Sequence, residues 1–388
     1  MEYLLKRSGA VLLILLLLCT ACSRQNSSEK DEWLEYAALD ADESSDELYK
    51  KALEEDVLIV YTVSTRVVQT KDSFEAAYPG LSVEVRDLRS PNLIEEVKEN
   101  YRRGASECDV VLCNDNSGDF KSHLVDTGIV VPYVPADIAP HMKEGSVGEM
   151  VSFLTEAEML LYNSAKYDSC PINNIWELTS EEYKGRIYMP NPLRSFSTYA
   201  FCGASTEHND ELAAAYKSLN GRDLEIPEGS TAYEVFWKNA SRNIIFTNSS
   251  DEVVEALKNG NADMGIAVSS KLRLKELGYD IDAAYKLDPF CGCRTSFAVM
   301  IARGSRNINT AKLFIHYLLG GEDGSGDGYK PFCTAGTWSA RNDIADGNPV
   351  PIEEINLIIP DQNKLISNRQ KTDEFWTQIL KESNNSEE

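Results

Sequence analysis

The chain has 388 residues, 38 of them basic and 62 acidic, so its formal net charge at pH 7 is −24 and its isoelectric point lies near 4.6. This charge excludes a nucleic acid as partner, because nucleic-acid binding depends on a positive surface. The length is sufficient for two domains with a substantial core.

The first 21 residues have the pattern of an export signal. Two basic residues precede an apolar run at 11–18, and small residues lead up to Cys22. The run is too short to remain as a membrane span. A small-residue site ending in Cys also resembles the lipobox of bacterial lipoproteins, although Cys19 stands where such motifs carry Leu. We predict a signal peptide over 1–21 and a lipid anchor on Cys22, with a plain signal peptide as the alternative.

Residues 22–56 are strongly acidic and contain few aromatic side chains. A segment of this composition cannot bury enough apolar surface to offset the entropy lost on ordering. We therefore predict an acidic flexible tether over 22–56, which would let a folded body diffuse close to the membrane surface.

From residue 57 onward, apolar strands alternate with helices. The predicted strands are 57–62, 81–86 and 109–113, and the predicted helices are 67–78 and 93–103. This order indicates a parallel, doubly wound sheet. Ligands bind beyond the carboxyl ends of such strands, which places Ser64, Thr65 and Asn114 at a candidate binding edge.

A second unit of the same kind begins near Thr155. Its predicted strands are 186–189, 243–247 and 263–268, and its predicted helices start after 193–198 and after Ser249 or Ser250. No further apolar run approaches the length of a membrane span.

Four stretches of this body resemble the extracellular solute-binding proteins of bacterial ABC importers. They are VLIVYTVSTRVVQTKDSFEAAYPGLSVEV from Val57, WELTSEEYKGRIYMPNPLRSFSTYAF from Trp176, TNSSDEVVEALKNGNADMGIA from Thr247 and AVMIARGSRNINTAKLFIHYLLGGE from Ala298. The most similar branch contains binders of ferric iron, phosphonates, sugar phosphates and polyamines.

The resemblance implies a two-lobed α/β fold, the type II periplasmic-binding-protein fold, with each lobe a doubly wound sheet flanked by helices. Lobe one would comprise 57–151 and 297–345, and lobe two 155–285. Hinge crossings would lie at 152–158 and 287–296, and a C-terminal helical segment, 346–388, would pack on lobe two. Such a protein is a monomer without a cofactor that closes on a small solute and delivers it to a membrane permease, outside the cytoplasmic membrane or in the periplasm.

The start of the second lobe's first helix is the strongest candidate ligand site. It carries Arg194, Ser195, Ser197 and Thr198, and no carboxylate enters this helix before Glu207. Free backbone N–H groups, the helix dipole and a guanidinium suit an anion such as a sugar phosphate or a phosphonate. Ordinary capping of the helix is the alternative.

Two further helix starts are weaker candidates. Ser64 and Thr65 resemble the same kind of cradle, with capping as the alternative. At Ser249 and Ser250, two acidic residues already occupy the helix start, which favours capping over anion binding.

Other ligands and roles stay open at this point. A polyamine, a neutral sugar or ferric iron could replace the anion, although the adjacent Tyr pair of the ferric-iron binders is absent. The subunit could also report to a membrane histidine kinase instead of a permease. An enzyme similar to thiaminases, with Cys113 as nucleophile, is a remote alternative. The odd number of remaining cysteines leaves their pairing undetermined, and no metal-ligand spacing is present.

Overall fold

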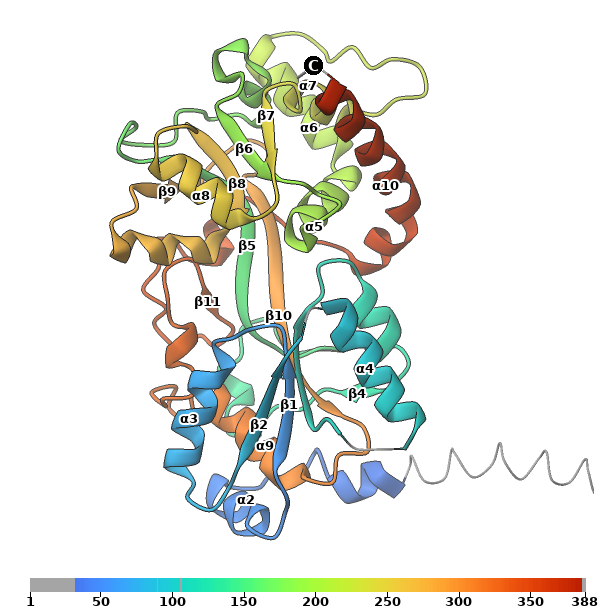
Figure 1. Cartoon of the computed structure of the whole chain (residues 1–388), viewed down its shortest axis with the longest axis vertical. Coiled ribbons are helices and arrows are strands. Elements are labelled where there is room, and N and C mark those ends of the chain that lie inside the picture. Colours follow the sequence, from blue (N-terminus) through green and yellow to red (C-terminus); the bar gives the residue numbers. More distant parts are fainter. Residues whose placement is uncertain (1–31, 89, 105–106, 386–388) are drawn as a thin grey trace, which may run out of the picture.

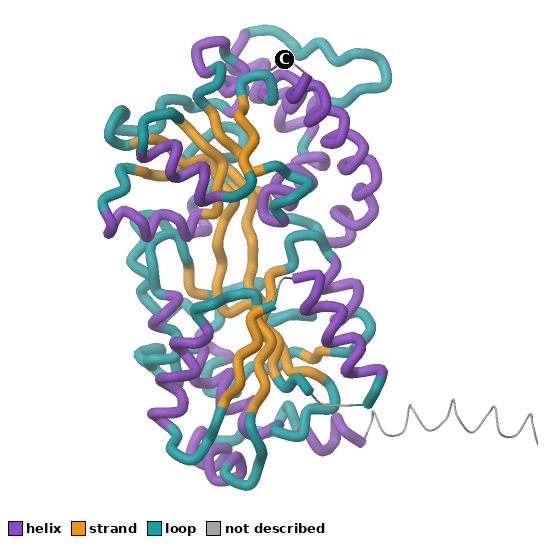
Figure 2. Tube along the Cα trace, viewed as in Figure 1, coloured by secondary structure: helices purple, strands orange, loops and turns teal. Residues whose placement is uncertain are grey.

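The structure, a computed structural model, describes residues 32–88, 90–104 and 107–385. The predicted signal peptide and Cys22 lie outside this range. Two lobes are stacked along the long axis of the molecule and are joined by long strands (Figures 1 and 2). Within the described ranges, no helix combines the length and apolar character needed to cross a membrane.

Lobe one contains the predicted parallel sheet. Its elements are β1 (Leu58–Thr62), α3 (Val67–Ala77), β2 (Val83–Asp87), α4 (Ser90–Arg102), β3 (Val110–Asn114), the short β4 (Val130–Val131) and α9 (Ile308–Leu318). Strand β1 pairs in parallel with both β2 and β3. The β-α-β-α-β order read from the sequence is confirmed. Strands β1 and β3 are nearly continuous buried apolar runs, as expected for strands covered on both faces.

Two long antiparallel strands connect the lobes. They are β5 (Ser152–Asn163) and β10 (Gly292–Ala302), paired from Met159 opposite Gly292 to Ser152 opposite Ala298. Strand β10 also pairs with β3 in lobe one, and β5 also pairs with β8 (Met264–Val268) in lobe two. The resulting sheet has the order β2-β1-β3-β10-β5-β8-β6-β7, so it runs without a break from one lobe into the other.

Lobe two repeats the layered arrangement. Its elements are β6 (Ile187–Pro190), α5 (Phe196–Ala204), α6 (Asn209–Asn220), α7 (Ala232–Ala240), β7 (Ile244–Thr247), α8 (Ser250–Lys258), β9 (Ile281–Ala283) and the short β11 (Trp338–Ser339) and β12 (Leu357–Ile358) at the junction. The C-terminal helix α10 (Gln362–Asn385) lies along this lobe (Figure 1). Trp376 of α10 is fully buried, and its Nε1 donates to the Tyr233 hydroxyl at 2.9 Å.

The expectation of a flexible tether over 22–56 is wrong for its described part, residues 32–56. Residues 32–37 and α2 (Ser45–Ala52) are helical, and the chain packs against α9 with Leu48 and Ala52 buried. Glu43 pairs with the buried Lys312 at 2.7 Å. The composition was misleading because the few apolar residues share one face of each helix, while the acidic residues bond to specific groups on lobe one.

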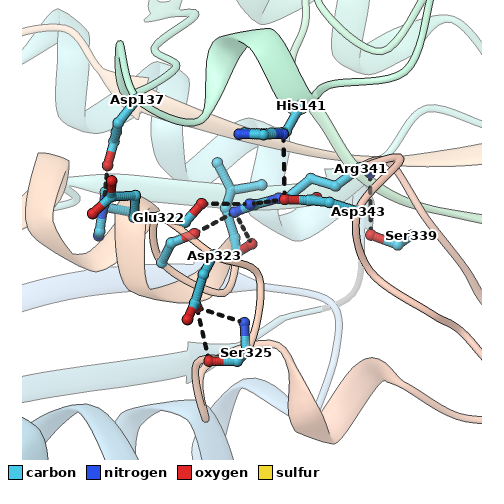
Figure 3. A network of polar contacts seen from close by, with 11 residues as sticks. Asp137, His141, Glu322, Asp323, Ser325, Ser339, Arg341 and Asp343 are labelled. Carbon is cyan, nitrogen blue, oxygen red and sulfur yellow. Dashed lines mark hydrogen bonds and ion pairs between the residues drawn. The ribbon is translucent and has the colours of Figure 1, made fainter.

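A buried arginine fixes the C-terminal part of lobe one. Arg341 is 1% exposed, and its guanidinium donates to the backbone carbonyls of Leu319, Gly321 and Glu322 and to the Asp343 carboxylate at 2.6 and 2.9 Å (Figure 3). A buried guanidinium needs partners of this kind, because an unpaired charge is costly to desolvate. The network therefore ties the loop after α9 to the strand that leads toward lobe two.

We expect Glu55 to stabilise lobe one by capping α9. Its carboxylate accepts from the backbone N–H groups of Asn309 and Thr310, at 3.0 and 2.8 Å, and from both of their side chains. Glu55→Ala should therefore lower the free energy of unfolding by about 2 kcal/mol. Urea denaturation would measure this, with the exposed Glu54→Ala as the matched control. Equal stability of the two variants would contradict the capping role.

Candidate functional site between the lobes

The carboxyl ends of strands from both lobes point toward the junction. Strand β5 runs from lobe one to lobe two, and β8 is antiparallel to it, so β8 and its parallel partner β6 run toward the junction. Strand β10 runs from lobe two to lobe one, and β3 is antiparallel to it. Strand β3 and its parallel partner β1 therefore run toward the junction from lobe one (Figure 1). The loops after these strands therefore meet between the lobes, where ligands bind in open α/β sheets.

Strand β5 presents two carboxylates on one face at this junction. Glu156 and Glu158 are two residues apart, so their side chains point to the same side of the strand. Arg66, at the start of α3 in lobe one, donates to Glu156 at 2.8 Å. Thr198, in the first turn of α5 in lobe two, donates its hydroxyl to Glu158 at 2.6 Å. The start of α3 in lobe one and the start of α5 in lobe two therefore both contact the same face of β5.

Glu158 of β5 places a carboxylate next to the start of α5, although the helix itself carries none before Glu207. Glu158 is fully buried, and burial raises its pKa from 4.5 to about 7, an effect opposed by the hydroxyls of Thr198 and Ser197. Its Oε2 has no hydrogen-bond partner among the described residues. Thr198 is also fully buried, so its hydroxyl holds Glu158 and does not face solvent.

The rest of the α5 start faces outward. The Ser195 hydroxyl caps the helix by accepting from the Thr198 backbone N–H at 3.4 Å. Ser197 is partly exposed, and Arg194 is exposed with its Nη1 donating to the Asn248 side chain at 3.3 Å. The loop after β6 and the loop after β7 therefore lie next to each other. Arg194 has no ion pair among the described residues.

A cavity of about 420 Å³, which we call the front cavity, lies beside this helix start. It is lined from both lobes: Ser117 and Asp119 come from the loop after β3, and the others are Pro192, Leu193, Arg194, Ser195, Phe196, Tyr199, Arg369, Asp373 and Thr377. Arg369 of α10 pairs with Asp119 at 2.8 Å and donates to the Ser117 carbonyl at 2.7 Å. The cavity is therefore closed on one side by a contact between the lobes.

Sequence reasoning missed the contribution of α10 to this cavity. Arg369 and Asp373 are four residues apart and therefore share one face of the helix. That spacing was visible in the sequence, but nothing in it indicated that the face would meet the loop after β3. Burial raises the pKa of the Tyr199 hydroxyl, and the nearby Asp373 carboxylate adds to this effect.

The remaining predicted residues do not line the front cavity. Ser64 and Thr65 form the turn between β1 and α3, and Asn114 ends β3. The Ser249 hydroxyl caps α8 by accepting from the Glu252 backbone N–H at 3.3 Å, and the Ser250 hydroxyl accepts from the Val268 backbone N–H at 3.4 Å. Ser249 therefore caps α8, as the alternative predicted, and Ser250 bonds to β8; ligand binding by these two serines stays a prediction.

The structure does not support a nucleophilic role for Cys113. Its side chain is fully buried in lobe one, where a substrate cannot reach the thiol. Among the described residues, the seven cysteines form no disulfide, and five of them are buried. In the part of the chain that the structure describes, no three or more His, Cys, Asp or Glu side chains are grouped to hold a metal ion.

Two α/β lobes joined by crossing strands, with a cavity between them, define a class of proteins that enclose a ligand by hinge closure. The chain belongs to the bacterial extracellular solute-binding proteins: the sequence profile described as "Bacterial extracellular solute-binding protein" matches residues 62–323. A search of curated proteins found no match.

Solved structures share the fold at low sequence identity. Iron-bound HitA from Pseudomonas aeruginosa is 17% identical with a TM-score of 0.59, and the similarity covers 84% of this chain and 99% of that protein. AfuA from Actinobacillus pleuropneumoniae, with fructose-6-phosphate bound, gives the same identity, coverage and TM-score. The substrate-binding protein of an ABC transporter from Agrobacterium tumefaciens is 13% identical, with coverage of 84% and 96% and a TM-score of 0.58.

The raised pKa of Glu158 predicts a pH-dependent cost to stability. The folded protein keeps the proton on Glu158 up to about pH 7, whereas the unfolded chain loses it near pH 4.5. Stability contributed by this group therefore falls as the pH rises through that window. Between pH 4.5 and about 7, the free energy of unfolding of Glu158→Gln should rise by about 3 kcal/mol relative to that of the wild type.

Urea denaturation of both proteins at several pH values would measure the difference. Glu225→Gln, at an exposed position, is the matched control. Its free energy of unfolding should change with pH in the same way as that of the wild type. A constant offset between Glu158→Gln and the wild type across the window would show that Glu158 ionises normally.

Proposed function

We propose that this protein is the solute-binding subunit of an ABC importer and that it captures a small organic anion, a sugar phosphate or a phosphonate, in the front cavity. The observation that carries the proposal is the position of Arg194. Its guanidinium lies on the cavity wall beside the start of α5 and makes no ion pair with any described residue. A guanidinium next to a helix N-terminus is suited to a phosphate or phosphonate group.

The other charges of the front cavity favour a sugar phosphate within this class. Asp119 and Asp373 lie on the wall with Arg194, and carboxylates accept hydrogen bonds from sugar hydroxyls. A polyamine would meet the guanidinium groups of Arg194 and Arg369 in the same space, which opposes its binding. The fold similarity to AfuA, whose structure contains fructose-6-phosphate, agrees with this choice.

Hinge closure would complete the site. Lobe one contributes Ser117 and Asp119 to the cavity, and lobe two and α10 contribute the remaining wall. A bound solute that contacts both walls would favour the closed arrangement, since a ligand shifts a conformational equilibrium by its difference in affinity for the two states. The permease would then recognise the closed form.

The predicted lipid anchor on Cys22 fits this role. We propose that the protein acts as a monomer outside the cytoplasmic membrane, held near its permease by acyl chains. Residues 32–56 pack on lobe one, so the connection to the membrane would leave from that lobe.

The decisive test is solute binding by wild type and Arg194→Ala. Thermal shift and calorimetry would be run with fructose 6-phosphate, methylphosphonate, spermidine and Fe(III). We expect the sugar phosphate to raise the melting temperature of the wild type. Arg194→Ala should bind about tenfold to hundredfold more weakly, because it removes a charge-assisted hydrogen bond.

The exposed Arg222→Ala is the control, because it removes the same charge from a distant part of lobe two. Its affinity should equal that of the wild type. Stabilisation by spermidine alone, or equal affinity of Arg194→Ala and wild type for the sugar phosphate, would contradict the proposal.

A further inference from the structure

The crossing strands border a second cavity on their other face. In the β5–β10 ladder, Arg294 lies opposite Ala157 and Ser296 lies opposite Thr155. These positions alternate with Glu156 and Glu158, so their side chains point to the opposite side of the strands from those two carboxylates. A cavity of about 380 Å³, which we call the back cavity, is lined by Arg294, Ser296 and Thr155.

Arg294 is the unusual group in the back cavity. Its side chain is partly buried, and desolvation lowers its pKa. Within the described ranges its guanidinium makes no hydrogen bond or ion pair. Glu353 acts on it electrostatically but lies beyond ion-pair distance, and its carboxylate contacts Lys143 at 3.6 Å. A partly desolvated guanidinium without a partner is costly unless an anion joins it.

A second polar group in the same cavity also lacks a partner. Gln362, just inside the start of α10, has a buried Oε1 without a hydrogen bond among the described residues. The amide Nε2 can donate to an oxyanion, whereas Oε1 can accept only from a ligand that carries a proton, such as hydrogen phosphate. The unpartnered amide and guanidinium therefore line one space.

The carboxylates around the back cavity do not neutralise Arg294. Asp115 accepts from the backbone N–H groups of Phe120 and Lys121, at 3.3 and 2.8 Å. Glu149 is largely exposed and contacts the Lys121 ammonium at 3.3 Å, and Glu144 is exposed at the rim. None of these acids forms an ion pair with Arg294. Asp115 is bonded to the backbone and burial raises its pKa, while Glu144 and Glu149 are exposed.

We propose that the back cavity is a second ligand site, which binds a small oxyanion, a phosphate or carboxylate group, on the Arg294 guanidinium. A planar guanidinium can bind either group through two parallel hydrogen bonds. Thr155 and Ser296 line the cavity with hydroxyls, and the Nε2 amide of Gln362 supplies N–H donors. This site is separate from the front cavity, because the two cavities share no lining residue.

Calorimetry with inorganic phosphate and with sodium acetate, at constant ionic strength, would test the proposal on purified Arg194→Ala protein. That variant weakens the front cavity but leaves the back cavity intact. We expect it to bind at least one of the two anions, and Arg194→Ala/Arg294→Gln to bind that anion about tenfold to hundredfold more weakly. Arg194→Ala/Arg242→Gln, which loses an exposed guanidinium outside both cavities, should bind as Arg194→Ala does.

Two results would overturn the proposal: no binding of either anion by Arg194→Ala, or equal binding by Arg194→Ala and Arg194→Ala/Arg294→Gln. If circular dichroism shows that the double variant does not fold, a crystal structure of the wild type with phosphate or acetate decides, and anion density away from Arg294 overturns the proposal. Failure of the sugar phosphate to bind the wild type would reject the proposed transport ligand and leave this result unaffected.

Discussion

The pairing of β5 with β10 is the constraint on which the rest of the structure depends. These two strands join the sheets of both lobes into one. Strand β5 also receives a side chain from each lobe, Arg66 on Glu156 and Thr198 on Glu158. Any movement of the lobes relative to each other must therefore bend or twist these strands. Such a movement either keeps or breaks each of the two contacts. The α5 start, which forms part of the front-cavity wall, is held on β5, whereas the lobe-one wall comes from the loop after β3.

The burial of Glu158 links this constraint to the chemistry of the front cavity. A carboxyl with a pKa of about 7 lies beneath the first turn of α5, whose other side forms the cavity wall. The helix dipole favours negative charge at this end, whereas burial opposes it. A solute anion at the same helix start would add a second negative charge and would further favour the protonated form of Glu158. Solute charge and Glu158 protonation therefore act on the same helix end.

The sequence predicted the strands and helices of both lobes better than the contacts between them. Buried parallel strands such as 58–62 and 110–114 are continuous apolar runs, which local composition reveals. Glu158 could not be placed because it precedes Thr198 by 40 residues and meets it only through the fold. Arg369 meets Asp119 for the same kind of reason. The segment 32–56 was misjudged because average acidity conceals an apolar face and specific acid–base partners such as Glu43 and Lys312.

Strand geometry gives the crossing strands two polar faces of different charge. Side chains alternate between faces, so Glu156 and Glu158 point to one side and Thr155, Arg294 and Ser296 to the other. The face with Glu156 and Glu158 is therefore acidic and is bonded by Arg66 and Thr198, whereas the other face carries the Arg294 guanidinium, which makes no ion pair among the described residues. A change in strand twist on lobe closure moves both faces together. Thermodynamic linkage then requires that an anion in the back cavity which prefers one lobe arrangement alters solute affinity in the front cavity, and the solute alters anion affinity to the same extent.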